Sequence, residues 1–233
     1  MKEQEKYKKE AAEKAVEYIK DGMTVGLGTG STTAYALYKI AQLIREGSLK
    51  KIRGIPSSKK TERLAKRLHI PLTDFSKITE IDLTIDGADE VDSQLNLIKG
   101  GGGALLREKI LIQFSKRVII VVDETKISKK LGTRCAVPIE VLPFAWEILT
   151  QYLNNLKAKS KLRRDAQKKP YLTDQKNYIL DTVFGVIKDP EALNSNLNQR
   201  AGIIEHGLFV ELATDVIVAG AKGNSHLKRY DLL

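Results

Sequence analysis

The sequence predicts an α/β fold in which helices flank a mostly parallel sheet, together with a smaller α+β domain. Two observations predict it. Short apolar segments alternate with segments of helical periodicity over the first 122 residues, and shorter elements punctuated by proline follow from Cys135 onward. Strands that alternate with helices form βαβ units, whose sheets are mostly parallel. We therefore expect a Rossmann-like sheet with its ligand site at the carboxyl ends of the strands.

The first predicted elements are a helix, a strand and a second helix. Residues 3–20 carry apolar side chains at helical spacing, with Lys and Glu on the other face, and an Asp-Gly pair ends this helix. Residues 23–27 are short and apolar, which is typical of a buried strand. The second predicted helix, residues 31–46, ends at Gly47. The residues expected to face the core are Leu37, Ile40, Ala41 and Ile44.

The alternation continues along the chain and predicts the rest of the sheet. Two apolar segments near the end, residues 207–212 and 215–219, predict strands that return to complete this sheet. The other predicted elements are strands at 51–56, 81–86 and 118–122 and helices at 59–68 and 104–114.

Prolines mark a change of organisation in the second half of the chain. They punctuate shorter elements at Pro138, Pro143, Pro170 and Pro190. We predict a small α+β domain at residues 132–205 and a catalytic α/β domain formed by residues 1–131 and 206–233.

Composition predicts a globular protein of the cytoplasm. The chain has 233 residues, of which 42% are hydrophobic and 29% charged, and no stretch is apolar enough to span a membrane. Residues 1–14 are rich in Lys and Glu, which argues against a secretory signal. Cys135 is the only cysteine, so an internal disulfide and a thiolate zinc site are excluded.

The net charge of +10 raises the question of nucleic-acid binding. The densest basic segment, residues 157–176, contains eight Lys and Arg residues but a single aromatic, Tyr171. A surface that binds nucleic acid through base stacking needs several aromatics. We therefore interpret this segment as a solvated face and expect no nucleic-acid partner.

A glycine-rich segment between the first strand and the second helix predicts a phosphate site. Residues 26–33 read Gly-Leu-Gly-Thr-Gly-Ser-Thr-Thr. Backbone amides, hydroxyl groups and a helix N-terminus together bind phosphate. A dinucleotide loop would need glycine at Ser31 or Thr33, and Ser31 as a simple N-cap remains the alternative. The predicted phosphate ligands are Thr29, Gly30, Ser31 and Thr32.

An acidic segment follows the strand at 81–86. It reads Asp86-Gly87-Ala88-Asp89-Glu90, and acidic residues at the carboxyl end of a strand lie where ligands bind. No His or further carboxylate is spaced to complete a metal site, so recognition of sugar hydroxyls is favoured and no metal is expected. The alternative is an Asp-Gly turn followed by a solvated loop.

Lys99 precedes four glycines, Gly100 to Gly103, and a helix that carries Glu108. Consecutive glycines are tolerated mainly where the backbone approaches a ligand or adopts positive φ, although a flexible loop is the alternative. Glu108 has only apolar residues three and four positions away. A carboxylate on such a face should have a raised pKa and suit a general base, unless a cation distant in sequence pairs with it.

Two lysines are further candidates for binding phosphate. Lys126 follows the most apolar strand and therefore lies at a carboxyl end. Lys8, on the first helix, could also reach phosphate, although a solvated position is its alternative.

Five segments together resemble the type A ribose-5-phosphate isomerase family along the whole chain. They lie at residues 28–32, 86–90, 99–105, 107–109 and 206–209. The resemblance implies a phosphate loop at 29–32, sugar contacts from Asp86 to Asp89, and a reacting end lined by Lys99, Gly100, Gly101 and Gly102. It also implies Glu108 as the base, phosphate contacts from Lys126 and Lys8, and a homodimer or tetramer. One departure is the segment 173–177, Thr-Asp-Gln-Lys-Asn, where family members often have Thr-Asp-Asn-Gly-Asn.

The expected reaction interconverts D-ribose 5-phosphate and D-ribulose 5-phosphate in the non-oxidative pentose phosphate pathway. Such an exchange removes a proton from carbon 2 and returns it to carbon 1 through an enediolate, which needs a base and an oxyanion partner but no cofactor. Glu108 and Lys99, with Asp86 and Asp89, match these needs. A sugar-phosphate sensor, a nucleic-acid-binding protein and another aldose-ketose isomerase remain alternatives, and residues 1–22 are too short for the DNA-binding domain that a sensor would carry.

Overall fold

The computed structural model describes residues 3–229, which form two compact units. Among the described residues, the first unit comprises residues 3–88, 107–126 and 211–229, and the second comprises Asp89–Leu106 and Ile127–Val210. The predicted limits of the small domain, residues 132 and 205, stay a prediction. The second unit also includes residues 89–106. Residues 1–2 and 230–233 of the predicted catalytic domain lie outside the described residues.

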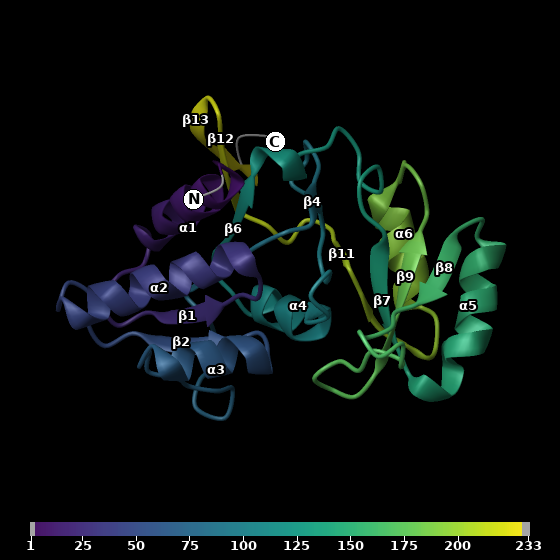
Figure 1. The fold of residues 1–233 in the computed structure, drawn as a ribbon, viewed down its shortest axis with the longest axis horizontal. Helices are drawn as coiled ribbons and strands as arrows, with labels where there is room; N and C mark the ends of the chain where they lie inside the picture. Colours follow the sequence, from purple (N-terminus) through teal and green to yellow (C-terminus); the bar gives the residue numbers. More distant parts are fainter. Residues whose placement is uncertain (1–2, 230–233) are drawn as a thin grey trace. The chain divides into compact units, whose positions relative to one another are not determined.

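The first unit is built on a mostly parallel sheet, as predicted, and this sheet has six strands. Figure 1 shows it among the helices of this unit. The strand order is β13-β12-β6-β3-β1-β2, and every neighbouring pair is parallel except β12 with β13. Its strands are β1 (Thr24–Leu27), β2 (Arg53–Pro56), β3 (Leu83–Asp86), β6 (Val118–Asp123), β12 (Asp215–Gly220) and β13 (Gly223–Lys228). The parallel pairs bring five strand ends, those of β1, β2, β3, β6 and β12, to one edge.

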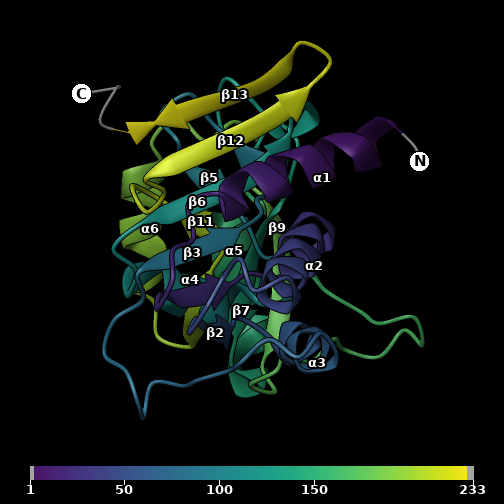
Figure 2. The same ribbon diagram turned by 90° about the vertical axis from the view of Figure 1, so that its left-hand side faces the viewer.

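Helices cover both faces of this sheet. They are α1 (Glu3–Val16), α2 (Ser31–Arg45), α3 (Lys59–Arg67) and α4 (Leu105–Gln113). The first two lie side by side, and α1 also runs beside β12 (Figure 2). Their apolar side chains join Val25 and Leu27 of β1 in the main core. Ile55 pairs with Gly26 and so points to the opposite face, where it packs with Leu111 of α4.

Two predictions about strands need correction. The segment 207–212 does not join the six-stranded sheet: it forms only β11 (Leu208–Phe209), which pairs with β5 (Leu97–Ile98) in a three-stranded sheet with β4 (Glu90–Val91). The polar strand β13 was not predicted, because it lacks the apolar alternation of a half-buried strand. Its backbone bonds to β12 along six residue pairs hold it instead.

The second unit is α+β, as predicted for the smaller domain. Its main sheet is antiparallel in the order β10-β7-β9-β8, and α5 (Trp146–Asn155) and α6 (Pro190–Asn198) accompany it. Leu149, Leu153 and Leu197 of these helices pack into its apolar core. The four strands are β7 (Val137–Val141), β8 (Lys159–Leu162), β9 (Tyr178–Val183) and β10 (Ile203–His206).

The turn at residues 173–177, which departs from the pattern of the family that the sequence resembles, is closed by hydrogen bonds. The amide of Lys176 donates to the carbonyl of Thr173 at 2.9 Å, and that of Thr173 donates to Asn177 at 3.0 Å. Lys176 has φ +65°, so it occupies the left-handed conformation that glycine adopts at lower cost. The Thr173 hydroxyl and the Asn177 amide nitrogen both donate to the buried Glu140 carboxylate, at 2.8 and 2.9 Å. These side-chain bonds hold the turn without glycine.

Asp215, at the start of β12, is the centre of a polar cluster at the amino-terminal end of the parallel strands. Arg117 donates two hydrogen bonds to its carboxylate at 2.8 Å each, the Thr214 hydroxyl donates at 2.7 Å, and His226 Nε2 lies 2.7 Å from Oδ1. Burial alone would raise the pKa of Asp215, but the bonds from Arg117, Thr214 and His226 outweigh it and lower the pKa to about 2.

This lowered pKa predicts a loss of stability in acid. Asp215 stabilises the fold above its ordinary pKa of 3.8, and that contribution disappears as the pH falls toward about 2. We expect Asp215→Asn to lower the free energy of unfolding at pH 7 by about 2 kcal/mol and to flatten its dependence on pH between about 4 and 2. Denaturant unfolding at a series of pH values measures this. The exposed control Glu46→Gln should change stability by less than about 0.5 kcal/mol; identical pH profiles for wild type and Asp215→Asn would refute the assignment.

Candidate active site

The predicted phosphate loop lies between β1 and α2. Gly30, with φ +146°, occupies the N-cap position of α2, so Ser31 is the first helical residue and its interpretation as an N-cap is wrong. The exposed Ser31 and the half-buried Thr32 lie on the first turn of the helix. A pocket of about 130 Å³ opens here, lined by residues that include Gly28, Gly30, Ser31, Thr33, Lys60 and Thr61.

Thr29 anchors this loop to the second strand and its helix. Its hydroxyl lies 2.7 Å from the Ser57 hydroxyl, 2.8 Å from that of Ser58 and 3.0 Å from that of Thr61. Thr61 also donates to the carbonyl of Gly28 at 3.0 Å. Sequence reasoning missed this anchoring role of Ser57 and Ser58. Two serines directly after a strand were the available signal, because strand ends gather at one edge.

Asp86 brings the acidic segment to the phosphate loop. It is the last residue of β3 and is 1% exposed. One carboxylate oxygen, Oδ1, accepts hydrogen bonds from the amides of Thr29 at 3.1 Å and Gly87 at 2.8 Å. Gly28 permits this approach, since a Cβ at that position would lie 2.2 Å from the same oxygen. Two of the predicted segments are therefore one structural feature.

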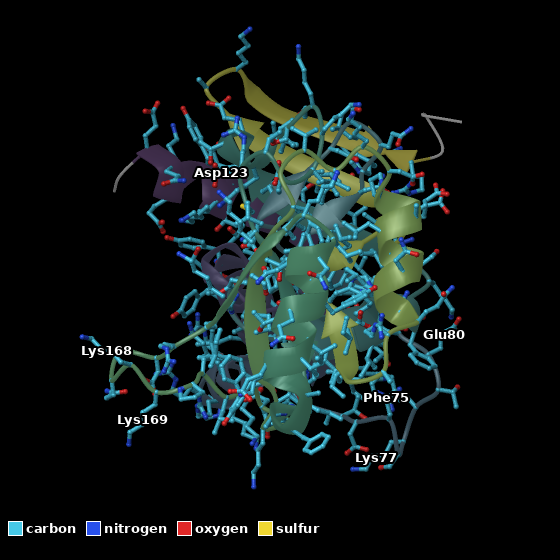
Figure 3. All side chains as sticks on the ribbon, turned by 90° about the vertical axis from the view of Figure 1, so that its right-hand side faces the viewer. Phe75, Lys77, Glu80, Asp123, Lys168 and Lys169 are labelled. Atoms are coloured by element: carbon cyan, nitrogen blue, oxygen red, sulfur yellow. The ribbon has the colours of Figure 1, made fainter. Side chains whose placement is uncertain are left out.

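Other strand ends of the first unit carry further polar groups. Asp123, labelled in Figure 3, is the last residue of β6. It is 1% exposed. Its Oδ1 accepts a hydrogen bond from the amide of Thr125 at 3.0 Å, while Oδ2 has no hydrogen-bond partner among residues 3–229. Lys126 follows in a short 3-10 helix and is half-buried. Sequence reasoning missed Asp123, although its position after a continuous apolar strand matches that of Asp86.

Lys8 lies on α1, where it bonds within the helix. Its ammonium nitrogen is 2.7 Å from Glu5 Oε1, and the Tyr35 hydroxyl donates to the other oxygen of Glu5 at 2.7 Å. The side chain of Lys8 is 14% exposed. The Lys8 side chain is therefore less exposed than the alternative, a solvated lysine, would be.

Glu108 lies in the first turn of α4 and is buried. Its exposed fraction is 3%, and Leu105, Leu111 and Ile112 on the same helix are exposed by 3% or less. The predicted apolar face of this helix is thus present. A carboxylate in such a position is shielded from water.

The second unit holds the remaining predicted residues around the glycine loop, which we define as residues 100–103. The amide of Gly101 donates to Asp89 Oδ2 at 2.8 Å, and that of Gly103 donates to the carbonyl of Gly100 at 2.9 Å. Gly100 and Gly103 have φ of +96° and +77°, which explains why glycine is needed there. Lys99 is 2% exposed, and its ammonium nitrogen lies 5.5 Å from the centre of the Phe209 ring. The loop is a hydrogen-bonded turn.

Two absences complete the description. Within residues 3–229, no three His, Cys, Asp or Glu side chains lie in an arrangement that could hold a metal ion. In the same part of the chain, every helix is too short or too polar to cross a membrane.

The fold and the bonded loops define an α/β protein whose strand ends hold a glycine-rich loop beside buried carboxylates. Comparison with known families makes this specific. A sequence model described as ribose 5-phosphate isomerase A (phosphoriboisomerase A) matches residues 53–223. The chain belongs to this family.

Individual relatives agree over nearly the full length. The chain is 54% identical to the ribose-5-phosphate isomerase A of Desulfatibacillum aliphaticivorans, over 98% of this chain and 99% of that one. The solved ribose 5-phosphate isomerase of Plasmodium falciparum has a TM-score of 0.93 and 41% identity, over 96% and 98% of the two chains. A D-ribose-5-phosphate isomerase solved in complex with phospho-erythronic acid has a TM-score of 0.95 and 41% identity, over 97% and 99%.

Proposed function

We propose that this chain is an aldose-ketose isomerase that interconverts D-ribose 5-phosphate and D-ribulose 5-phosphate in the non-oxidative pentose phosphate pathway. The observation that carries the proposal is the hydrogen bond from the Thr29 amide of the phosphate loop to the Asp86 carboxylate, in a chain of this family. A phosphate group and a polyhydroxyl chain are the two parts of such a substrate, and the loop and the carboxylate are suited to one part each.

Glu108 is the proposed base. It removes the proton from carbon 2 and returns it to carbon 1, so a single carboxylate serves both half-reactions. Lys99 stabilises the negative oxygen of the enediolate that forms between these steps. Asp86 and Asp89 hold sugar hydroxyls, and an ionised carboxylate is a strong acceptor for them. This assignment needs no metal or organic cofactor.

The phosphate is proposed to bind at the amino-terminal end of α2. Ser31 and Thr32 lie there in the first turn, and the helix dipole favours an anion. Lys60 lines the same pocket and, with Lys126 and Lys8, completes the proposed phosphate contacts. The phospho-erythronic acid bound by the solved relative supports this class of ligand, because its planar carboxylate resembles the two oxygens of an enediolate.

We also propose that the chain acts in the cytoplasm as a homodimer or homotetramer. Large apolar side chains of the second unit support self-association, since Phe144 is 99% exposed and Ile148, four residues further on, is 63% exposed. Apolar side chains at this level of exposure are typical of surfaces that are covered in an assembly.

The direct test of the activity is conversion of ribose 5-phosphate by the purified chain, with six-carbon aldose phosphates as competitors. Preference for the five-carbon substrate, kept after treatment with a chelator, is expected. A sensor would bind the sugar phosphate without turnover, and preference for a six-carbon substrate would identify another aldose-ketose isomerase. A nucleic-acid protein would be retained on DNA at physiological ionic strength.

The phosphate site predicts an effect on binding. Replacing Ser31 and Thr32 together by Ala removes two hydroxyl donors that act equally in the ground and transition states. We expect KM for ribose 5-phosphate to rise by about tenfold while kcat changes less, as loss of uniform binding does. Ser195→Ala on the exposed face of α6 is the control and should leave both constants unchanged. An unchanged KM in the double variant would exclude this phosphate site.

The proposed base predicts an effect on turnover. Glu108→Gln keeps the shape of the side chain and removes the proton acceptor, so kcat should fall by about 10²- to 10⁴-fold while substrate still binds. Steady-state kinetics and binding of ribose 5-phosphate measure the two effects. Glu147→Gln, in the exposed first turn of α5, should leave kcat unchanged. A folded Glu108→Gln variant with near-normal kcat would overturn the assignment.

A further inference from the structure

The basic segment at residues 157–176 contains two residues that face the glycine loop. We propose that Arg163 and Tyr171 are positioning residues that hold the glycine loop in the conformation required for catalysis. This inference rests on the proposed isomerase function for its catalytic part. Its structural part concerns only the second unit and can be tested separately.

Arg163 bonds to the glycine loop and to a carboxylate at the same time. Its Nη1 donates to the carbonyl oxygens of Gly100 at 3.1 Å and Gly101 at 3.0 Å. Its other two nitrogens donate to the two oxygens of Asp181 on β9, with Nε 2.9 Å from Oδ2. This bidentate pair fixes the plane of the guanidinium and therefore aims Nη1 at the loop.

Tyr171 completes the contact from the adjacent side. Its hydroxyl donates to the carbonyl of Gly102 at 3.3 Å, and burial raises the pKa of Tyr171 above its ordinary value of 10. The ring packs against Gly103, where a Cβ would lie 2.5 Å from the Tyr171 hydroxyl oxygen. The Arg163 guanidinium carbon lies 5.8 Å from the centre of the same ring.

A hairpin sets both residues in place. Arg163 directly follows β8, and its amide donates to the carbonyl of Ile179 at 2.8 Å. The amide of Tyr171 donates to the carbonyl of Arg163 at 2.9 Å, so these two residues form the base of the excursion at 163–171. Lys168 and Lys169 lie at its exposed tip (Figure 3). The basic residues of this segment are exposed, as predicted for a solvated face, except Arg163, which is half-buried.

The consequence concerns the backbone amides of the loop. Three successive carbonyls, those of Gly100, Gly101 and Gly102, are bound by the two side chains. In a planar trans peptide, the C=O of one residue and the N–H of the next point in opposite directions. Holding a carbonyl therefore also sets the direction of the following N–H. The amides of Gly101 and Gly103 have protein acceptors, whereas that of Gly102 has no hydrogen-bond partner among residues 3–229. Its N–H is held available for an oxygen of the substrate or enediolate.

Glycine makes this support necessary. Glycine has the greatest backbone freedom of any residue type. A loop of four consecutive glycines would therefore sample many conformations without bonds to other segments. Misplacing a group by about 1 Å can lower a rate by about 10²-fold. Arg163 and Tyr171 therefore supply the order that the loop sequence lacks.

The test compares neighbouring arginines. Arg163→Met keeps the apolar stem of the side chain and removes its bonds to the loop. The Asp181 side chain is 36% exposed with Arg163 in place, so water can solvate its charge when the guanidinium is removed. We expect kcat for ribose 5-phosphate to fall by about 10- to 100-fold with a smaller change in KM. Arg163→Lys should restore activity only in part, because one ammonium cannot replace the guanidinium fork. Tyr171→Phe should lower kcat by about three- to tenfold.

Arg164→Met is the matched control. Arg164 is exposed and donates to the carbonyl of Lys168 within the hairpin, so its variant should retain normal kcat and KM. Amide hydrogen exchange, measured by NMR without substrate, reports the loop itself. Exchange of the Gly101 and Gly103 amides should accelerate by about tenfold or more in Arg163→Met and remain unchanged in Arg164→Met.

Unchanged exchange or unchanged kcat in a folded Arg163→Met variant would overturn the proposal, as would equal losses in Arg164→Met. If the wild-type chain does not convert ribose 5-phosphate, the proposed function fails and the catalytic part of this inference fails with it. The exchange measurement then decides whether Arg163 and Tyr171 hold the loop.

Discussion

The close approach of β1 and β3 is the constraint on which the first unit depends. Two glycines of β1 and its following loop make it possible: a Cβ at Gly26 would lie 1.9 Å from the Thr84 hydroxyl oxygen, and one at Gly28 would lie 2.2 Å from Asp86 Oδ1. Because the two glycines leave this space to the side chains of Thr84 and Asp86, the Asp86 carboxylate reaches the amide of Thr29. The parallel sheet, the phosphate loop and the acidic segment are joined by this contact.

Catalysis in this account relies on loops that are ordered before the substrate arrives. Thr29 is bound by three hydroxyl-bearing residues in the first unit, and the glycine loop of the second unit is bound by Asp89, Arg163 and Tyr171. Donors that are already oriented need no reorganisation when charge develops on the enediolate, and this is where such sites gain most of their rate. The surrounding residues therefore matter as much as those that touch the sugar.

The sequence was a good guide wherever local pattern determines structure. Periodicity predicted the parallel strands and helices of the first unit and the apolar face of α4 that carries Glu108, while the phosphate loop and the roles of Asp86 and Glu108 stay predictions. The sequence failed where distant pairing decides: β13 is polar and is held by its ladder with β12, and β11 is drawn to β5 instead of the main sheet. Ser57 and Asp123 were missed although each ends or directly follows a strand. The contacts of Arg163 with the glycine loop depend on tertiary structure that no spacing along the chain reveals.

The most direct test of the central claim is to follow hydrogen during the reaction in D₂O. If Glu108 transfers a proton through an enediolate, wild-type protein brought to equilibrium with ribose 5-phosphate should place solvent deuterium at carbon 1 of ribulose 5-phosphate and at carbon 2 of ribose 5-phosphate. The NMR spectra of both sugars measure this. A shielded carboxylate exchanges only part of its protons with solvent in each turnover, but many turnovers should label both sugars. Interconversion at equilibrium without any deuterium in either sugar would indicate direct hydride transfer between the two carbons and would contradict the account.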